Sequence, residues 1–177
     1  GYETYWKGVL SHDLSTNPVY EEAGEFGREI ARFGRETLCI SRKNQVAVVI
    51  DNQSLSSFNW FPIDKDLSYN DVVRWMYDCL YEMNISCDII DIHQLEEKFD
   101  QEQKPYQMIV TPALYSVSDA FVQKMKGFVQ AGGVVVSSFK SFVADRQLSV
   151  YSDVQPHGMT DCFGMSYNQF TEPGRAT

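Results

Sequence analysis

Polar side chains that could act as acids, bases or nucleophiles follow directly after the apolar runs of the chain. The first of these runs, residues 46–50, is followed at once by Asp51 and Asn52. If the runs are strands of one parallel sheet, the side chains that follow them meet at its carboxyl edge, where open α/β sheets bind ligands. The candidates for such a site are Asp51, Asn52, Asp91, His93, Thr111, Ser137 and Ser138.

The four cysteines do not have the surroundings of a nucleophile. A thiol nucleophile on a sheet of this kind lies on a tight strand-to-helix turn flanked by glycines, and neither Cys39 nor Cys162 has such neighbours. Cys79 falls inside a predicted helix and Cys87 begins a predicted strand, so we interpret both as core residues. No pair has C-x-x-C spacing, which favours reduced thiols. An amidotransferase-like thiol enzyme remains an alternative, although no cysteine lies on the glycine-flanked turn that its nucleophile would need.

The chain shows neither metal-binding spacing nor a complete catalytic set. The paired glutamates Glu21-Glu22 and Glu96-Glu97 could in principle serve glycoside chemistry, but both fall on predicted helix surfaces. The histidines lack the H-x-x-x-H and H-E-x-x-H patterns of metal sites. They are His12, His93 and His157. We therefore expect no catalytic residue, no metal and no cofactor in this chain.

Composition limits the possible partners. The 177 residues carry 24 acidic and 15 basic side chains, giving a formal net charge of −9. Nucleic acids and anionic membranes attract a basic face, so neither is expected as a partner. Hydrophobic residues make up 44% of the chain, which is typical of a globular protein, and no apolar run reaches the length of a membrane span. We expect a cytoplasmic protein.

Alternating apolar runs and amphipathic segments predict an α/β fold. The expected helices cover residues 17–34, 70–84 and 117–131, with a short helix or loop at 94–104. The expected strands cover residues 46–50, 87–92, 107–110 and 134–136, with one more at 162–167. Strands and helices in alternation favour a doubly wound, mainly parallel sheet with helices on both faces, flavodoxin-like or amidotransferase-like. The uninterrupted apolar run 46–50 belongs at or near its centre.

Residues 53–69 are predicted to form a long aromatic loop after the first sheet strand. Such connections usually have about 2–6 residues, and longer ones tend to be functional. Phe58, Trp60 and Phe61 would be costly to expose without a partner. The loop is therefore a candidate interface or pocket with Trp60 as its main contact, unless Trp60 lies in the core of its own domain.

An ordered series of motifs resembles glycoside hydrolase family 42 β-galactosidases. The segments W-K-G-V-L-S-H-D, N-P-V-Y-E-E and F-G-R-E-I, which start at Trp6, Asn17 and Phe26, resemble the end of the catalytic barrel. The middle domain of that family is matched in order and spacing by V-A-V-V-I-D-N, I-S-C-D-I-I, Y-Q-M-I-V-T-P-A-L-Y and F-V-Q-A-G-G-V-V-V-S-S-F. The resemblance covers nearly the whole chain.

The resemblance implies a division of the chain and a parent activity. Residues 1–40 would be the last strand and helix of a truncated TIM barrel, and residues 44–170 an amidotransferase-like trimerisation domain. The parent would hydrolyse terminal β-D-galactosides with two glutamates that lie outside this chain. Glu3 matches a galactose-contacting glutamate of the family, Trp6 stands where relatives have histidine, and Trp60 falls in a loop near the neighbouring subunit's active site.

The expected partners are thus a galactoside substrate and copies of the same chain, in a trimer. A non-catalytic ligand-binding or assembly domain is the main alternative, because the chain itself offers no complete catalytic set. The two interpretations are compatible if the parent is the enzyme and the chain its assembly part.

Overall fold

The computed structural model describes residues 9–37, 40, 42–62 and 64–169. The chain divides into two compact units, Gly1–Lys43 and Asn44–Thr177. Because their relative positions are not determined, each unit is described by itself.

The described part of the first unit consists mainly of one helix, α1 (Pro18–Thr37). It begins where the sequence predicts, because the side chain of Asn17 accepts a hydrogen bond from the backbone N–H of Tyr20 at 3.0 Å. Its apolar residues recur every three or four positions and are exposed. They are Phe26, Ile30 and Phe33, and the exposed Val19 lies seven positions before Phe26. A stripe of this kind normally packs against a larger apolar surface.

We expect amide hydrogen exchange to be faster in α1 than in the first sheet strand, Val46–Ile50. The apolar side of α1 is exposed, whereas Val46 to Val49 are buried, so local opening of the helix breaks fewer contacts. Exchange measured by mass spectrometry on the 177-residue chain checks this. Equal protection of the two segments in dilute solution would mean that α1 is integral to a single folded domain.

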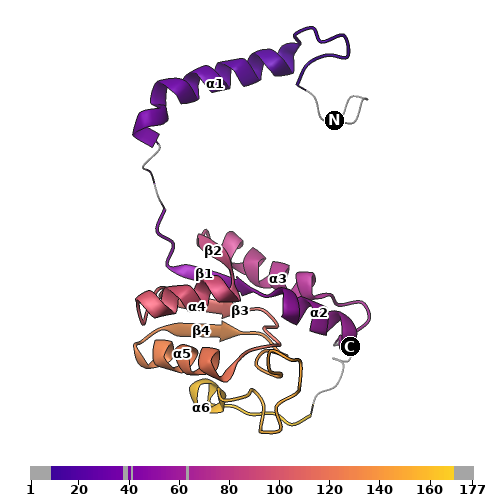
Figure 1. Cartoon of the computed structure of the whole chain (residues 1–177), viewed down its shortest axis with the longest axis vertical. Coiled ribbons are helices and arrows are strands. Elements are labelled where there is room, and N and C mark those ends of the chain that lie inside the picture. The colour runs from indigo at the N-terminus through magenta and orange to yellow at the C-terminus, as the bar shows by residue number, and fades with distance from the viewer. Residues whose placement is uncertain (1–8, 38–39, 41, 63, 170–177) are drawn as a thin grey trace. The chain divides into compact units, whose positions relative to one another are not determined.

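The second unit is built on a four-stranded, wholly parallel sheet (Figure 1). Its strands are β1 (Val46–Ile50), β2 (Cys87–Asp91), β3 (Met108–Thr111) and β4 (Val134–Ser137), in the order β2-β1-β3-β4. Val48 of β1 lies in register between Ile89 and Val110. The prediction that 46–50 is an inner strand is confirmed.

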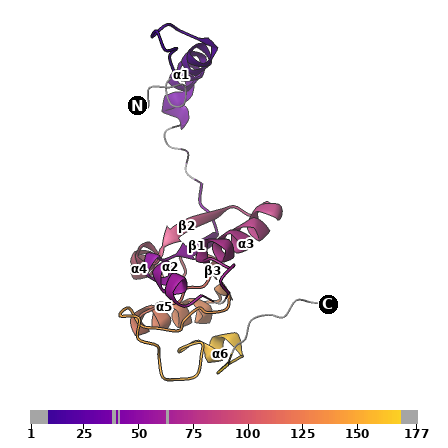
Figure 2. The same cartoon turned by 90° about the vertical axis from the view of Figure 1, so that its right-hand side faces the viewer.

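Helices cover both faces of this sheet, as Figures 1 and 2 show. On one face, Ala47 and Val49 pack in a core with side chains of α4 (Ile92–Gln101) and α5 (Asp119–Gln130). On the other face, Val48 packs with Leu80 of α3 (Tyr69–Glu82). Successive residues of β1 thus point into different cores, which is why the run is apolar throughout. The predicted doubly wound α/β fold is confirmed.

Four local expectations are wrong. Residues 53–69 are not one long loop, because helix α2 (Asn52–Trp60) fills their first half. Residues 162–167 are not a strand; they include the end of the four-residue helix α6 (Thr160–Phe163), which Gly164 ends with φ of 63°. Cys79 is exposed on α3 and is not a core residue. Helix α5 starts two residues later than predicted, because Ser118 caps it by accepting a hydrogen bond from the N–H of Phe121.

Candidate functional site

Asp51, the first residue after β1, fixes the start of α2. Its carboxylate oxygen Oδ2 accepts hydrogen bonds from the backbone N–H of Ser54 at 2.7 Å and from the Ser54 hydroxyl at 2.6 Å. This is the N-cap geometry that satisfies otherwise unpaired donors of the first helical turn. Asp51 is 3% exposed, so its negative charge needs a buried counter-charge.

Arg146 supplies that counter-charge. Its Nη1 lies 3.0 Å from Asp51 Oδ2 and its Nη2 lies 3.1 Å from Asp51 Oδ1, a bidentate pair. Nη1 also donates to the carbonyl oxygen of Ser116 at 2.9 Å, and the Gln53 side chain donates to the carbonyl of Arg146. The N–H of Ser116 donates to Ser54 Oγ at 3.0 Å. These contacts therefore join three separate segments of the chain, which contain Asp51, Ser116 and Arg146, at the start of α2.

The other end of α2 presents an exposed aromatic pair, Trp60 and Phe61. Trp60 is 80% exposed and Phe61 66%, whereas Phe58, two residues before Trp60, is 1% exposed and makes an edge-to-face contact with Tyr69. Lys140 Nζ lies 5.7 Å from the centre of the Phe58 ring and donates a hydrogen bond to the carbonyl of Phe61. Phe58 therefore anchors the helix, and Trp60 does not belong to the domain core.

A cavity of about 360 Å³ lies beside this aromatic pair. It is lined by Phe61, Tyr115, Lys140, Val143, Leu148, Val150, Gln155, Tyr167 and Asn168. Burial raises the pKa of the Tyr115 hydroxyl and lowers that of the Lys140 amine. With mainly apolar walls and a few polar groups, the cavity could hold an apolar side chain or a small ligand.

The remaining candidates at the carboxyl edge support the fold. Asp91 caps α4 by accepting a hydrogen bond from the N–H of His93 at 2.9 Å. The ring of His93 is exposed, and its Nδ1 lies 3.3 Å from a carboxylate oxygen of Glu96 on the next turn. Ser138 Oγ accepts a hydrogen bond from the N–H of Ala113 at 2.6 Å. These groups hold backbone in place and do not converge on a common point.

The other three candidates at the same edge also do not come together in a common site. Asn52 is exposed at the start of α2, and the Ser137 hydroxyl donates to the Ser138 carbonyl at 3.3 Å. Thr111 is fully buried, and among the described residues its hydroxyl has no hydrogen-bond partner. Across the part of the chain that the structure describes, no group of three or more histidine, cysteine, aspartate or glutamate residues is placed to hold a metal ion.

The described cysteines do not form a nucleophile site. Burial raises the pKa of Cys87, whereas a nucleophilic thiol needs a lowered pKa. Cys79 lies within α3 and Cys162 within α6, away from any strand-to-helix turn. Cys39 lies outside the described residues, as do the two barrel candidates Glu3 and Trp6.

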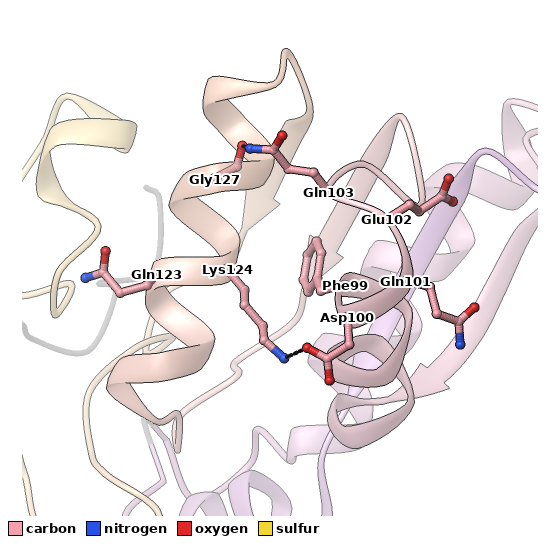
Figure 3. Close-up of a pocket in the computed structure, with 8 residues that line it drawn as sticks. All are labelled: Phe99, Asp100, Gln101, Glu102, Gln103, Gln123, Lys124 and Gly127. Carbon is pink, nitrogen blue, oxygen red and sulfur yellow. Dashed lines mark hydrogen bonds and ion pairs between the residues drawn. The ribbon is translucent and has the colours of Figure 1, made fainter.

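A second, more open crevice of about 520 Å³ lies between α4 and α5 (Figure 3). Lys124 on α5 forms an ion pair with Asp100 at 2.5 Å, and Gln103 Nε2 donates to the carbonyl of Gly127 at 3.2 Å. The crevice is lined by Phe99, Asp100, Gln101, Glu102, Gln103, Gln123, Lys124 and Gly127. These two contacts join α5 to α4 and the segment that follows it, so the crevice resembles an ordinary seam between two helices.

Fold and surface together define an α/β domain with a doubly covered parallel sheet and a prominent exposed tryptophan. Within the described residues, no helix is long and apolar enough to cross a bilayer. Residues 44–174 match the family of β-galactosidase trimerisation domains of glycoside hydrolase family 42. The chain belongs to this family.

The relatives in sequence are β-galactosidases, and they match nearly the full length of this chain. β-Galactosidase LacZ of Lactobacillus acidophilus is 28% identical over 167 residues, which is 93% of this chain and 24% of the relative. β-Galactosidase BgaA of Clostridium cellulovorans is 21% identical and covers 99% of this chain and 26% of its own length. The chain therefore spans about a quarter of the length of these curated relatives.

Two solved β-galactosidase structures are similar to this chain. A β-galactosidase from Bacillus circulans sp. alkalophilus superposes with a TM-score of 0.76 at 26% identity, over 87% of this chain and 22% of its own. A β-galactosidase from Halorubrum lacusprofundi superposes with a TM-score of 0.73 over 92% of this chain and 23% of its own. At 23% identity the second likeness shows the fold alone.

Proposed function

We propose that the chain is the assembly part of a β-galactosidase whose parent hydrolyses terminal β-D-galactosides. The observation that carries this proposal is the family match over residues 44–174, which is named for trimerisation of β-galactosidases. The hydrolysis would proceed with retention, through a carboxylate nucleophile and a carboxylic acid outside this chain. No cofactor is required by that chemistry, and a cytoplasmic location is part of the proposal.

The second part of the proposal assigns Trp60 to contact between subunits in a homotrimer. A cyclic trimer joins two different patches of each subunit, and large aromatic residues at the centre of such patches contribute most of the binding energy. Trp60 stands out from the end of a helix that is fixed at its start by the buried Asp51–Arg146 pair. A rigid, exposed aromatic side chain is suited to enter a pocket on a neighbouring subunit.

From the same position Trp60 would line the entrance of the neighbouring active site, where an indole can stack on a sugar face. Glu3, which matches a glutamate of the family, and Trp6, which stands where relatives have histidine, are the proposed galactose contacts of the barrel. Hydrolysis of a chromogenic β-galactoside by the full-length parent tests the proposed activity, and the 177-residue chain alone is expected to show none. Turnover by the chain alone that disappears on mutation of one of its own residues would contradict the assembly role.

In the full-length parent, Trp60→Ala should weaken trimer assembly or raise the Michaelis constant for galactosides while leaving the fold intact. Truncation of a central aromatic contact typically costs about 2 kcal/mol or more of binding energy, roughly a thirtyfold loss of affinity. Sedimentation velocity over a range of concentrations measures assembly, and steady-state kinetics measure the Michaelis constant.

Trp75→Ala is the matched control, because Trp75 is also an exposed tryptophan, 59% accessible, but lies on α3. Its effects on trimer assembly and on the Michaelis constant should be smaller than those of Trp60→Ala. If Trp60→Ala unfolds the protein, or if both variants behave like the native parent, the role given to Trp60 is wrong.

A ligand-binding domain is the second candidate, and the cavity beside Phe61 favours it. The cavity has the size and mixed lining of a small-molecule site. Val143→Trp would fill it. This variant should abolish binding of a ligand that occupies the cavity, whereas a domain that serves assembly alone has no such binding to lose.

A further inference from the structure

His157 is clamped between two carboxylates that come from different parts of the domain. Its Nε2 lies 2.7 Å from Asp119 Oδ1 in the first turn of α5, and its Nδ1 lies 2.9 Å from both carboxylate oxygens of Asp153. Its side chain is 16% exposed. The histidine thus links the irregular segment 150–159 to the start of a core helix.

The hydrogen-bond chemistry of this arrangement requires a charged ring. A neutral imidazole donates from one nitrogen only, and the other nitrogen presents a lone pair. Ionised Asp119 and Asp153 both accept hydrogen bonds, so only the imidazolium can donate to the two of them at once. Loss of the proton would leave one carboxylate facing a nitrogen lone pair, which is repulsive.

The segment around His157 is closely packed, so the ring cannot easily move to other partners. The ring stacks on Tyr151 with centroids 3.4 Å apart and planes 6° from parallel. The Tyr151 hydroxyl donates to the carbonyl of Val117 at 3.1 Å, just before α5. At Gly158, with φ of 63°, an added Cβ would lie 2.7 Å from a methyl carbon of Val122 on α5.

We propose that His157 is a proton-dependent latch, whose imidazolium fastens segment 150–159 to the N-terminal end of α5 through Asp119 and Asp153. The segment also carries Val150 and Gln155, which line the cavity beside Phe61. Opening of the latch would therefore loosen one wall of that cavity. The proposal depends only on contacts within this chain and holds whether or not the parent is a β-galactosidase.

The charges around the ring set the direction of the pH dependence. Burial by itself lowers the pKa of His157, but hydrogen bonds and charge attraction from Asp153 and Asp119 outweigh it, so the pKa is raised above its usual value of 6.5. A raised pKa means that the latch stabilises the folded state fully below about pH 6.5 and that this stabilisation is lost as pH rises through the folded-state pKa.

Among the described residues, three titratable groups contact the ring: Asp119 from α5, and Asp153 and Tyr151 from its own segment. The pKa of Tyr151 is itself raised, by burial and then by the charges of Asp119, Asp145 and Asp153, so its hydroxyl stays neutral in this range. The proton that controls the latch is therefore the one on His157.

Nuclear magnetic resonance titration of the histidine ring protons in the 177-residue chain tests the proposal. We expect the titration midpoint of His157 to lie above the midpoint of the same ring in the urea-unfolded chain. Asp119→Asn and Asp153→Asn should each lower the folded midpoint. A folded midpoint at or below the unfolded one, or one that neither variant moves, would overturn the latch.

Thermal unfolding gives a second readout. His157→Gln should lower the melting temperature most at about pH 6, and the difference from the native chain should shrink towards about pH 9. His93→Gln is the control, because His93 contacts a single carboxylate and its side chain is 68% exposed; its effect should be small at both values. If His157→Gln does not fold, the Asp153→Asn titration decides alone.

Discussion

Val48→Asp should unfold the unit Asn44–Thr177. Val48 is fully buried on an inner strand and packs between its β2 and β3 neighbours under helix α3. The side chains around it in this cluster are apolar, among them Leu80 and Val110, so a carboxylate placed there would be buried unpaired. The cost of burying it unpaired is about 4 kcal/mol or more, and the whole stability of a typical domain is only about 5–15 kcal/mol. Circular dichroism during heating should show loss of the cooperative transition.

Ile89→Asp is the matched control. Ile89 is the register partner of Val48 on β2, yet 54% of it is exposed. The same chemical change should therefore cost less than about 1 kcal/mol. Equal stability of Val48→Asp and the native chain would show that β1 is not an inner strand.

The sheet could be predicted from sequence because burial on both faces leaves a plain signal. An inner strand of such a sheet needs apolar side chains at consecutive positions, and β1 has the predicted boundaries, 46–50. The helices α3 and α5 show the usual periodicity, and the caps at Ser68 and Ser118 fix their starts. In these elements, the apolar residues that form the pattern in the sequence are the residues that pack in the core.

Helix α2 escaped prediction because its stability does not come from amphipathic periodicity. Its sequence mixes serine and asparagine with aromatic residues, which favours a loop when judged by propensity alone. What starts the helix is the capping carboxylate of Asp51, and what fixes that carboxylate is Arg146, far along the chain. A contact between residues 95 positions apart leaves no local pattern, so Arg146 could not be selected as a site residue from sequence.

The same limit applies to His157. The sequence shows three separated histidines without a common pattern, and only the folded chain brings Asp119 and Asp153 to opposite sides of one ring. Trp60 is different, because an aromatic residue beyond a sheet strand is visible in the sequence. The structure adds that Trp60 is exposed while its neighbour Phe58 is buried, a distinction that composition cannot supply.

Removal of Arg146 should be the most damaging single change outside the apolar core. Asp51 is 3% exposed, and without Arg146 its charge would keep only the two hydrogen bonds from Ser54. The carbonyl of Ser116 would also lose a donor. Breaking a buried pair by deleting one partner costs about 3–5 kcal/mol, and since 24% of the Arg146 side chain is exposed, we expect the lower end of that range.

Arg146→Met, which keeps most of the side-chain volume, should therefore lower the free energy of unfolding by about 3 kcal/mol in urea titrations. The double variant Asp51→Asn, Arg146→Met should recover part of this loss, because asparagine still caps α2 but carries no charge. Lys124→Met is the control: it breaks the ion pair with Asp100, whose side chain is 66% exposed, and should cost less than about 1 kcal/mol. If Arg146→Met is no more destabilising than Lys124→Met, the Asp51–Arg146 pair does not hold α2, and the rigid presentation of Trp60 loses its physical basis.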